Sequence, residues 1–243
     1  MSNSGFEHLA KLHPHPRDGM IRFEDEGHRY YLFDPDTGEW DLCTKANGWV
    51  SSTGIGAALF PFNALAAARC IFRGKNFATG QYKDLKSPQD IVAAWGERAK
   101  KGTYFHEKCP EAYYNNIPID HDDPEIAELV PKFLKFAEDH QHLEPWRTEW
   151  LVYDQHVRVS GSIDMVFKEP DGSLSLYDWK RVDKILPEDG KEPQKYKRIA
   201  KKDKDQRRTP DDLQKKSKLV KYSLQLAVYK HILQQQYGVT IKD

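Results

Sequence analysis

The stretch GSIDMVFKEPDGSLSLYDWK, residues 161–180, constrains the fold more than any other part of this 243-residue sequence. Two runs typical of strands flank the turn signal EPDGS. Gly172 supplies the left-handed residue that closes a three-residue hairpin loop after Pro-Asp. Counting outward from that loop, Asp164 faces Asp178, although a slip of one residue would change this register. The sequence therefore predicts an antiparallel hairpin with two carboxylates at facing positions.

The second strand of this hairpin changes in character along one face. Leu174 and Leu176 form its apolar start. Asp178 and Lys180 follow on the same face, because residues two apart on a strand point the same way. Facing Cβ atoms lie roughly 5 Å apart, so two bare carboxylates repel each other unless one is protonated or a cation lies between them. This arrangement favours a divalent metal held by oxygen ligands, with an ammonium beside it.

A plainer alternative is a surface hairpin with an exposed Asp–Lys pair. Two observations favour the metal site over this alternative. Asp164 faces Asp178 across the hairpin, and Gly161 permits a close approach of another part of the chain to the first strand. Trp179 points to the opposite face from the acids.

Length and composition bound the domain organisation. A chain of 243 residues is long enough for one large domain with a substantial core. Residues 1–19 are polar, with alternating His and Pro, and are expected to be poorly ordered. Residues 20–243 are expected to form a single domain. Within it, 20–146 hold a β-hairpin and a helical part, and 147–243 hold the main sheet, a basic segment over 181–221 and a C-terminal helix.

Capping signals predict two helices in the middle of the chain. Ser87 is a helix cap followed by proline at the first helical position, and this helix is expected to stop near Gly102. Thr103 is then expected to cap a second helix that carries His106 one turn inside. Pro110 is expected to kink or restart this second helix.

Periodicity and turn signals predict the remaining elements. They are, in order, short strands over 20–42, helices over 51–72 with a break at Pro61, a helix over 123–140, strands over 148–154, 157–167 and 174–180, an amphipathic helix over 221–236, and a strand beginning at 237. Helices and strands in this order predict a mixed α/β layer structure.

Charge is unevenly distributed although the formal net charge is zero. Residues 181–221 hold 15 Lys and Arg against 8 Asp and Glu, so the rest of the chain is acidic by the same amount. Such a segment is commonly a solvated loop, and beside an acidic site it is also suited to phosphate contacts.

Cysteine content and hydropathy exclude several classes of protein. Cys43, Cys70 and Cys109 are too few for the four thiolates of an iron–sulfur cluster and too far apart for a disulfide scaffold. No apolar run approaches the length of a membrane span, and the N-terminus lacks the apolar core of a signal peptide. These features predict a soluble intracellular protein with no membrane partner.

Four motifs in order resemble the RecB-type branch of the PD-(D/E)xK nuclease superfamily, which includes phage and mitochondrial genome-maintenance exonucleases. The motifs are GTYFHE at 102–107, GSID at 161–164, YDWK at 177–180 and QLAVY at 225–229. The resemblance extends from about Ile21 to Tyr229. It implies an α/β fold with a restriction-endonuclease-like αβββαβ core and a mixed sheet. It also implies metal-dependent hydrolysis of phosphodiester bonds.

The same resemblance implies roles for individual residues. One or two Mg²⁺ or Mn²⁺ ions would be bound by His106, Asp164, Asp178, the backbone carbonyl of Trp179 and, as a further candidate, Glu149. The catalytic set would be Asp164, Asp178 and Lys180, with Gln225 and Tyr229 supporting the site. Lys180 would position or deprotonate the attacking water, or stabilise charge on the phosphate. DNA contacts are expected from Thr103, Arg181, Lys201, Lys202, Arg207, Arg208 and Tyr222.

The sequence thus favours a DNA exonuclease acting on single-stranded or end-containing DNA in replication, recombination or repair, where protein partners are also expected. An RNA endonuclease is the first alternative, because the same acids cut RNA. A non-catalytic DNA-binding module is the second. Such a module would lack one of the acids or the lysine, and all of them are present here.

Overall fold

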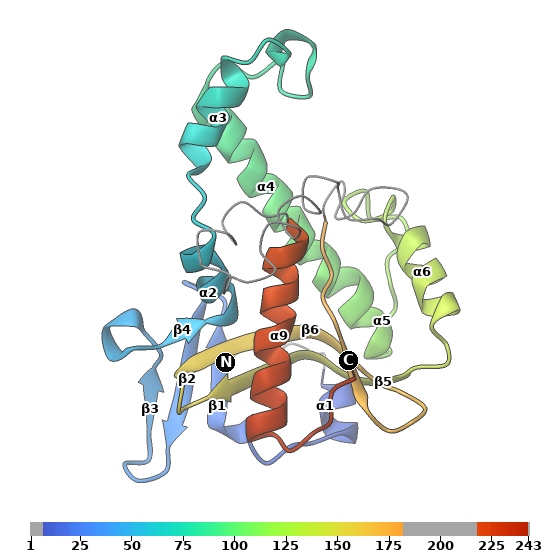
Figure 1. Ribbon diagram of the computed structural model, residues 1–243. Helices are drawn as coiled ribbons and strands as arrows, with labels where there is room; N and C mark the ends of the chain where they lie inside the picture. The colour runs from blue at the N-terminus through green and yellow to red at the C-terminus, as the bar shows by residue number, and fades with distance from the viewer. Residues whose placement is uncertain (1–6, 182–217, 243) are drawn as a thin grey trace, which may run out of the picture.

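The structure is a computed structural model that describes residues 7–181 and 218–242. It confirms the predicted α/β class with a mixed sheet, and helices cover both faces of that sheet (Figure 1). The described elements are, in order, α1 (His8–Leu12), η1 (Asp18–Met20), β1 (Ile21–Glu24), β2 (Arg29–Asp34), β3 (Glu39–Leu42), η2 (Lys45–Asn47), β4 (Val50–Ser51), α2 (Ser52–Leu59), α3 (Ala64–Phe72), η3 (Phe77–Thr79), α4 (Pro88–His106), η4 (Glu107–Glu111), α5 (Ala112–Tyr114), α6 (Val130–Asp139), β5 (Glu144–Asp154), β6 (Val159–Lys168), β7 (Leu174–Tyr177) and α9 (Lys218–Gln236).

β6 is the central strand of the main sheet. β5 pairs antiparallel with it along nearly its whole length. On the other edge of β6, β4 pairs parallel with its start and β7 pairs antiparallel with its end. Among the described residues, no strand pairs with positions 161–164 on that edge. The candidate site lies beside this opening between β4 and β7.

The β6–β7 hairpin has the predicted register. The pair nearest the site joins Met165 to Tyr177, and Gly172 takes a φ of 87° in the loop. β7 ends at Tyr177. Continuing the register by one residue brings Asp178 opposite Asp164, just beyond the end of the strand.

Two hydrophobic cores hold this hairpin from opposite faces. Leu174 and Leu176 pack in the core under α9, which also contains Tyr229. Tyr177 and Trp179 pack in the core under α6. Burying one large apolar side chain stabilises the fold by roughly 1.5–3 kcal/mol. The predicted division between the leucine face and the tryptophan face is therefore confirmed.

The prediction that the N-terminal segment is poorly ordered is wrong for residues 7–19. Leu9 is buried in the core under α6. Asp18 accepts hydrogen bonds from Arg147 (2.8 Å) and from the indole of Trp150 (3.0 Å). These partners are 129 and 132 residues away in the sequence, so local signals cannot reveal them.

The N-terminal region predicted as a β-hairpin contains three paired strands rather than two. β1, β2 and β3 form a separate antiparallel sheet, because the run after the turn DPDTG also pairs. At the other end of the chain, the predicted last strand amounts to a parallel bridge between Ile241 and Leu174.

α4 begins with the predicted cap but continues through Gly102 to His106, so its predicted end is wrong. Thr103 lies inside the helix, where its hydroxyl donates to the carbonyl of Ala99 at 3.5 Å instead of capping a new helix. Gly102 is buried, and a Cβ atom there would lie 3.8 Å from Cβ of Arg181. The glycine therefore does not terminate the helix, and the site has room for a Cβ atom in ordinary van der Waals contact.

Two further helical predictions differ from the structure in detail. Pro110 lies in η4, a π-helical segment that joins α4 to α5. Proline lacks an N–H group and crowds the preceding turn, and a locally widened helix accommodates it. The helix predicted over 123–140 begins only at Val130, because the residues before it form turns.

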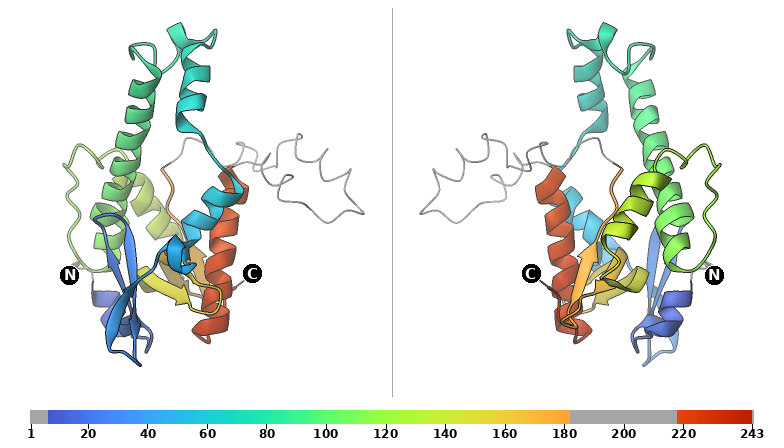
Figure 2. Two further views of the ribbon diagram at one scale, coloured as in Figure 1. Left: turned by 90° about the vertical axis from the view of Figure 1, so that its left-hand side faces the viewer. Right: turned by 90° about the vertical axis from the view of Figure 1, so that its right-hand side faces the viewer.

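α3 and the first half of α4 pack together and project away from the sheet (Figure 2). We call this projection, residues 64–100, the helical arm. Among the described helices, none is both long and apolar enough to cross a bilayer alone. The pair α2 and α3, bent by 55°, satisfies that test only when taken together.

Candidate metal centre

Three neighbouring strands bring three acids into one row. Thr148 pairs with Met165 and Trp150 with Ile163, so Glu149 lies opposite Asp164. Asp178 follows on the other side of Asp164, one residue past the end of β7. The row therefore crosses β5, β6 and the extension of β7.

Glu149 is held in an uncommon backbone conformation. Its φ is 43°, in the left-handed region that residues with a Cβ atom seldom adopt. The hydroxyl of Ser162 donates to Oε2 of Glu149 at 2.7 Å. Backbone strain of this kind costs about 1–3 kcal/mol and is concentrated at functional sites.

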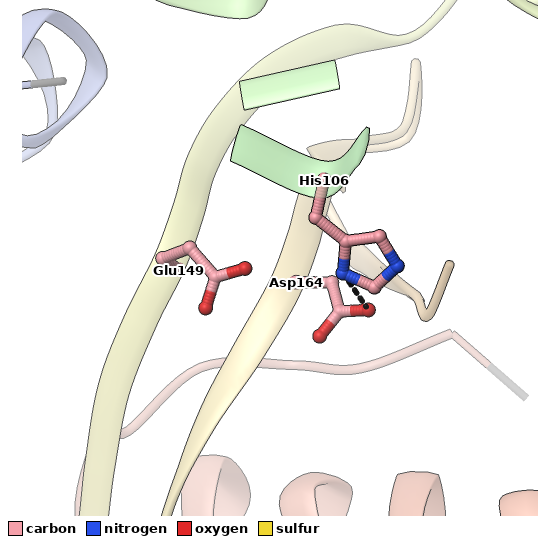
Figure 3. Close-up of side chains that lie close together, drawn as sticks. All are labelled: His106, Glu149 and Asp164. Atoms are coloured by element: carbon pink, nitrogen blue, oxygen red, sulfur yellow. Dashed lines mark ion pairs between the residues drawn. The ribbon is translucent and has the colours of Figure 1, made fainter. Parts of the chain in front are cut away.

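His106 brings an imidazole to the acids from the end of α4. Ligand atoms of His106, Glu149 and Asp164 all lie within 4.8 Å of one another, and the three side chains point toward a common centre (Figure 3). Nδ1 of His106 is 3.6 Å from Oδ2 of Asp164. Burial, followed by the positive charge of Lys180, lowers the pKa of His106 to about 4. The ring is thus neutral at neutral pH, as a metal ligand must be.

Lys180 lies between two of the acids. Its Nζ donates to Oδ1 of Asp178 at 2.5 Å and is 3.9 Å from Oδ2 of Asp164. The backbone N–H of Trp179 donates to the same Asp164 oxygen at 2.8 Å. The ammonium is therefore the cation that allows two facing carboxylates at this position.

Burial raises the pKa of all three acids, and the charge of Asp164 raises it further for Glu149 and Asp178. Burial, then the charge of Asp164, raises the pKa of Glu149 to about 7. The same two causes raise the pKa of Asp178 to about 6. Burial also raises the pKa of Asp164, against the opposing effect of Lys180. A bound cation would stabilise the ionised form of these buried carboxylates and offset the cost of their burial.

The residues fit a divalent ion with oxygen ligands. Oδ2 of Asp178 is buried and has no hydrogen-bond partner among the described residues. A buried, unpaired carboxylate oxygen is costly, and a metal ion would satisfy it. Carboxylates suit Mg²⁺ and Mn²⁺, and a neutral imidazole can complete the ligand set.

The structure distributes the predicted ligands in two groups. His106, Asp164 and the further candidate Glu149 lie together, whereas Asp178 lies beside them in contact with Lys180. The backbone of Trp179, the remaining predicted ligand, raises the pKa of His106 against the effect of burial.

Glu111 is an acid beside the centre that sequence reasoning missed. Burial, followed by the charge of Glu149 and smaller contributions from Glu107, Asp25 and Asp164, raises its pKa to about 8. Glu111 follows His106 by five residues, which a regular α-helix places roughly 140° apart around its axis. The π-helical segment η4 changes that relation, and no local signal except Pro110 indicates it.

We expect the stability of the metal-free protein to fall as pH rises from about 6.5 to 8.5. In the unfolded chain Glu111 and Glu149 are already deprotonated at about pH 6.5. In the folded chain Glu149 releases its proton only near pH 7 and Glu111 only near pH 8. The folded state binds more protons, so the free energy of unfolding decreases with pH, by up to about 1.4 kcal/mol per pH unit for each acid. Below about pH 6.5 the lowered pKa of His106 acts in the opposite direction.

Denaturant unfolding in chelator, at about pH 6.5, 7.5 and 8.5, measures this slope. Glu111→Gln is neutral at every pH and should flatten the slope. Glu97→Gln, which removes an exposed acid paired with Lys100 on α4, should leave it unchanged. Stability that rises across this window would contradict the protonated state of the two acids.

Gln225 and Tyr229, the two residues expected to support the centre, are hydrogen-bonded to each other. The Tyr229 hydroxyl accepts from the amide of Gln225 (3.2 Å) and from the hydroxyl of Ser52 (2.7 Å). Ser52 is a second participant that sequence reasoning missed. Both hydroxyls contact the backbone at Gly161, because a Cβ atom there would lie 2.7 Å from Ser52 Oγ and 3.0 Å from Tyr229 Oη. The predicted close approach at Gly161 is confirmed.

Gly161→Ala is expected to destabilise the protein by about 1–3 kcal/mol, the usual cost of overpacking a filled core. Its Cβ would meet the buried side chains of Ser52 and Tyr229 well inside van der Waals contact. Gly102→Ala is the matched control. It adds a Cβ where the nearest atom is 3.8 Å away, and it should stabilise α4 by up to about 1 kcal/mol. If urea unfolding shows that both substitutions change the free energy of unfolding in the same direction, this account is wrong.

A cleft of about 420 Å³ adjoins the centre. Three residues expected to contact DNA, Thr103, Arg181 and Tyr222, line it together with His106 and Lys180. Nζ of Lys180 lies 5.4 Å from the centre of the Tyr222 ring. Four other expected contacts fall outside the described residues: Lys201, Lys202, Arg207 and Arg208.

Comparison of the chain with models of protein families, with curated proteins and with solved structures finds no match.

Proposed function

We propose that this protein is a metal-dependent nuclease that hydrolyses phosphodiester bonds in DNA. The observation that carries the proposal is the row of Glu149, Asp164 and Asp178, with His106 on one side and Lys180 between two of the acids. An acid row with one basic nitrogen and one ammonium suits a divalent ion and a substrate phosphate.

The element order supports membership of the PD-(D/E)xK superfamily as part of the same proposal. α4, β5, β6, β7, α9 and the bridge at Ile241 occur in the order that the αβββαβ core of a restriction-endonuclease-like fold would require, with η4, α5 and α6 inserted between α4 and β5. The four motifs that resemble the RecB-type branch all contribute to one region. Two of them meet in the contact between Asp164 and the Trp179 N–H, and QLAVY contributes Tyr229 against Gly161 of GSID.

Each side chain then has a chemical task. His106, Glu149 and Asp164 would hold Mg²⁺ or Mn²⁺, with Asp178 supplying its unpaired oxygen. The bound ion would provide Lewis-acid stabilisation of the phosphate and lower the pKa of an attacking water. Lys180 would orient that water or stabilise charge on the phosphate oxygens. Tyr229, Gln225 and Ser52 would fix the position of α9 against β6 beside the site.

A cleavage assay tests the proposed function. End-labelled linear and closed circular single-stranded DNA, matched duplex DNA and matched RNA are incubated with Mg²⁺, with Mn²⁺ and with chelator. We expect metal-dependent loss of the linear single strand with little cutting of the circle, which identifies an exonuclease. Faster cutting of RNA, including circular RNA, would replace the proposal by an RNA endonuclease. Binding to DNA without cutting in either metal would replace it by a non-catalytic module.

A further inference from the structure

One face of α4 connects the helical arm to the metal centre. Trp95, Ala99, Gly102 and His106 recur at intervals of three or four residues, so they lie along one side of the helix. All four line the same cleft. The small side chains in the middle of this series leave the cleft open between an aromatic end at Trp95 and the centre at His106.

The aromatic end is a preorganised pair of rings. The indole N–H of Trp95 donates to the hydroxyl of Tyr82 at 2.7 Å. Their ring centres are 6.4 Å apart, and the ring planes meet at 76°. Both residues line the cleft and neither is fully buried. Holding the two rings at fixed positions lowers the conformational entropy lost when a planar ligand stacks on one of them.

The wall opposite α4 carries positive charge. Lys180, Arg181 and Tyr222 line it. Nη1 of Arg181 is buried and has no hydrogen-bond partner in the part of the chain that the structure describes. A buried guanidinium nitrogen without a partner is costly, and an anionic ligand in the cleft would satisfy it.

We propose that Tyr82 and Trp95 form a stacking subsite for an unpaired base of a single-stranded nucleic acid whose phosphates contact Arg181 and Lys180. Aromatic rings beside cations suit this ligand, because every base has a π face and every nucleotide carries a charge. The inference rests on the proposed function, since it assigns the strand preference of that same site to the helical arm.

The spacing along α4 predicts where the stacked base lies. Eleven residues separate Trp95 from His106, which is a rise of about 16 Å. That distance corresponds to about five stacked nucleotides at roughly 3.4 Å each, and to fewer if the strand is extended. We therefore expect the base that stacks on Trp95 to lie about three to five nucleotides along the strand from the phosphate at the metal centre.

A double-mutant cycle tests the subsite, with one change in the protein and the removal of one base from the bound strand as the other. Binding of wild type and Trp95→Ala is measured in chelator, where no metal-dependent cleavage occurs, to a 20-nucleotide strand and to strands with one abasic site moved along it. Loss of one base–aromatic stack corresponds to a Kd about 5- to 150-fold higher. We expect wild type to show this loss for the strand with one particular abasic position. Trp95→Ala should bind that abasic strand and the intact strand with the same Kd.

Two variants control the experiment. Trp95→Phe keeps a ring and should retain most of the affinity. Tyr104→Ala removes an exposed ring of the same helix that bonds to Asp123 outside the cleft, and it should bind as wild type does. Even if Trp95→Ala is unfolded in a thermal melt, the abasic scan of wild type decides the matter. Equal Kd values at every abasic position, or additive losses in the cycle, would overturn the subsite.

The outcome is separable from that of the proposed function. A positive cycle in a protein that cuts no nucleic acid would leave the stacking subsite in place and refute the nuclease. Metal-dependent cleavage without any coupling between Trp95 and a base would support the nuclease and refute the subsite.

Discussion

Asp164→Asn should bind Mn²⁺ at least about 100-fold more weakly than the wild type. Removing a group that merely supports a metal ligand typically costs roughly 10- to 100-fold in affinity, and Asp164 is expected to be a ligand itself. It lies in the middle of the acid row, with ligand atoms of His106 and Glu149 within 4.8 Å. Asparagine has the same size and still accepts from the Trp179 N–H, so the loss reports charge rather than packing.

Titration calorimetry with Mn²⁺ measures this change. Asp139→Asn, which removes an exposed acid paired with Lys135, is the matched control and should leave the isotherm unchanged. Single-turnover cleavage by Asp164→Asn should fall together with the affinity. If Asp164→Asn binds Mn²⁺ as wild type does, the metal centre is not at this position.

Lys180→Ala is expected to lose turnover by about 10²- to 10⁴-fold, which is roughly 3–5 kcal/mol of activation free energy. Binding of DNA should change far less, because one phosphate contact among many contributes little. Binding of Mn²⁺ should not weaken at all. The ammonium occupies the space between Asp164 and Asp178 in the metal-free protein, and its removal leaves those carboxylates freer to accept an ion.

Single-turnover cleavage and equilibrium binding to one oligonucleotide test this separation. Lys180→Met keeps the length of the side chain without the charge and should resemble Lys180→Ala. Lys168→Met removes a lysine of the same sheet that pairs with Glu144 on the surface, and it should cut normally. Equal cleavage rates in wild type and Lys180→Ala would remove this lysine from the mechanism.

The parts of the fold that were predictable depend on local geometry. A Pro-Asp-Gly loop permits few hairpin registers, so the pairing of Met165 with Tyr177 and the position of Asp178 opposite Asp164 follow from turn chemistry. Strand alternation likewise places Trp179 and Leu176 on opposite faces. The cap at Ser87 marks the start of α4 for the same reason.

The parts that were missed depend on contacts between distant residues or on irregular backbone. Ser52 reaches Tyr229 across 177 residues of sequence. Glu111 comes near the acids through a π-helical segment, and Glu149 turns toward them through a left-handed φ. Gly102 is a typical helix-stop signal, yet α4 continues through it, and a Cβ atom there would make only ordinary van der Waals contact with Arg181.

The hydrogen bond from the Trp179 N–H to Asp164 has a thermodynamic consequence. It joins a carboxylate of the ion site to the backbone of the segment that carries Lys180 and Arg181 into the cleft. A cation bound by Asp164 and a nucleic-acid strand bound in the cleft, as we propose, would therefore act on one peptide segment from opposite ends. Linkage requires that the factor by which nucleic acid changes the affinity for the cation equals the factor by which the cation changes the affinity for nucleic acid. A measurement of either factor is thus a measurement of both.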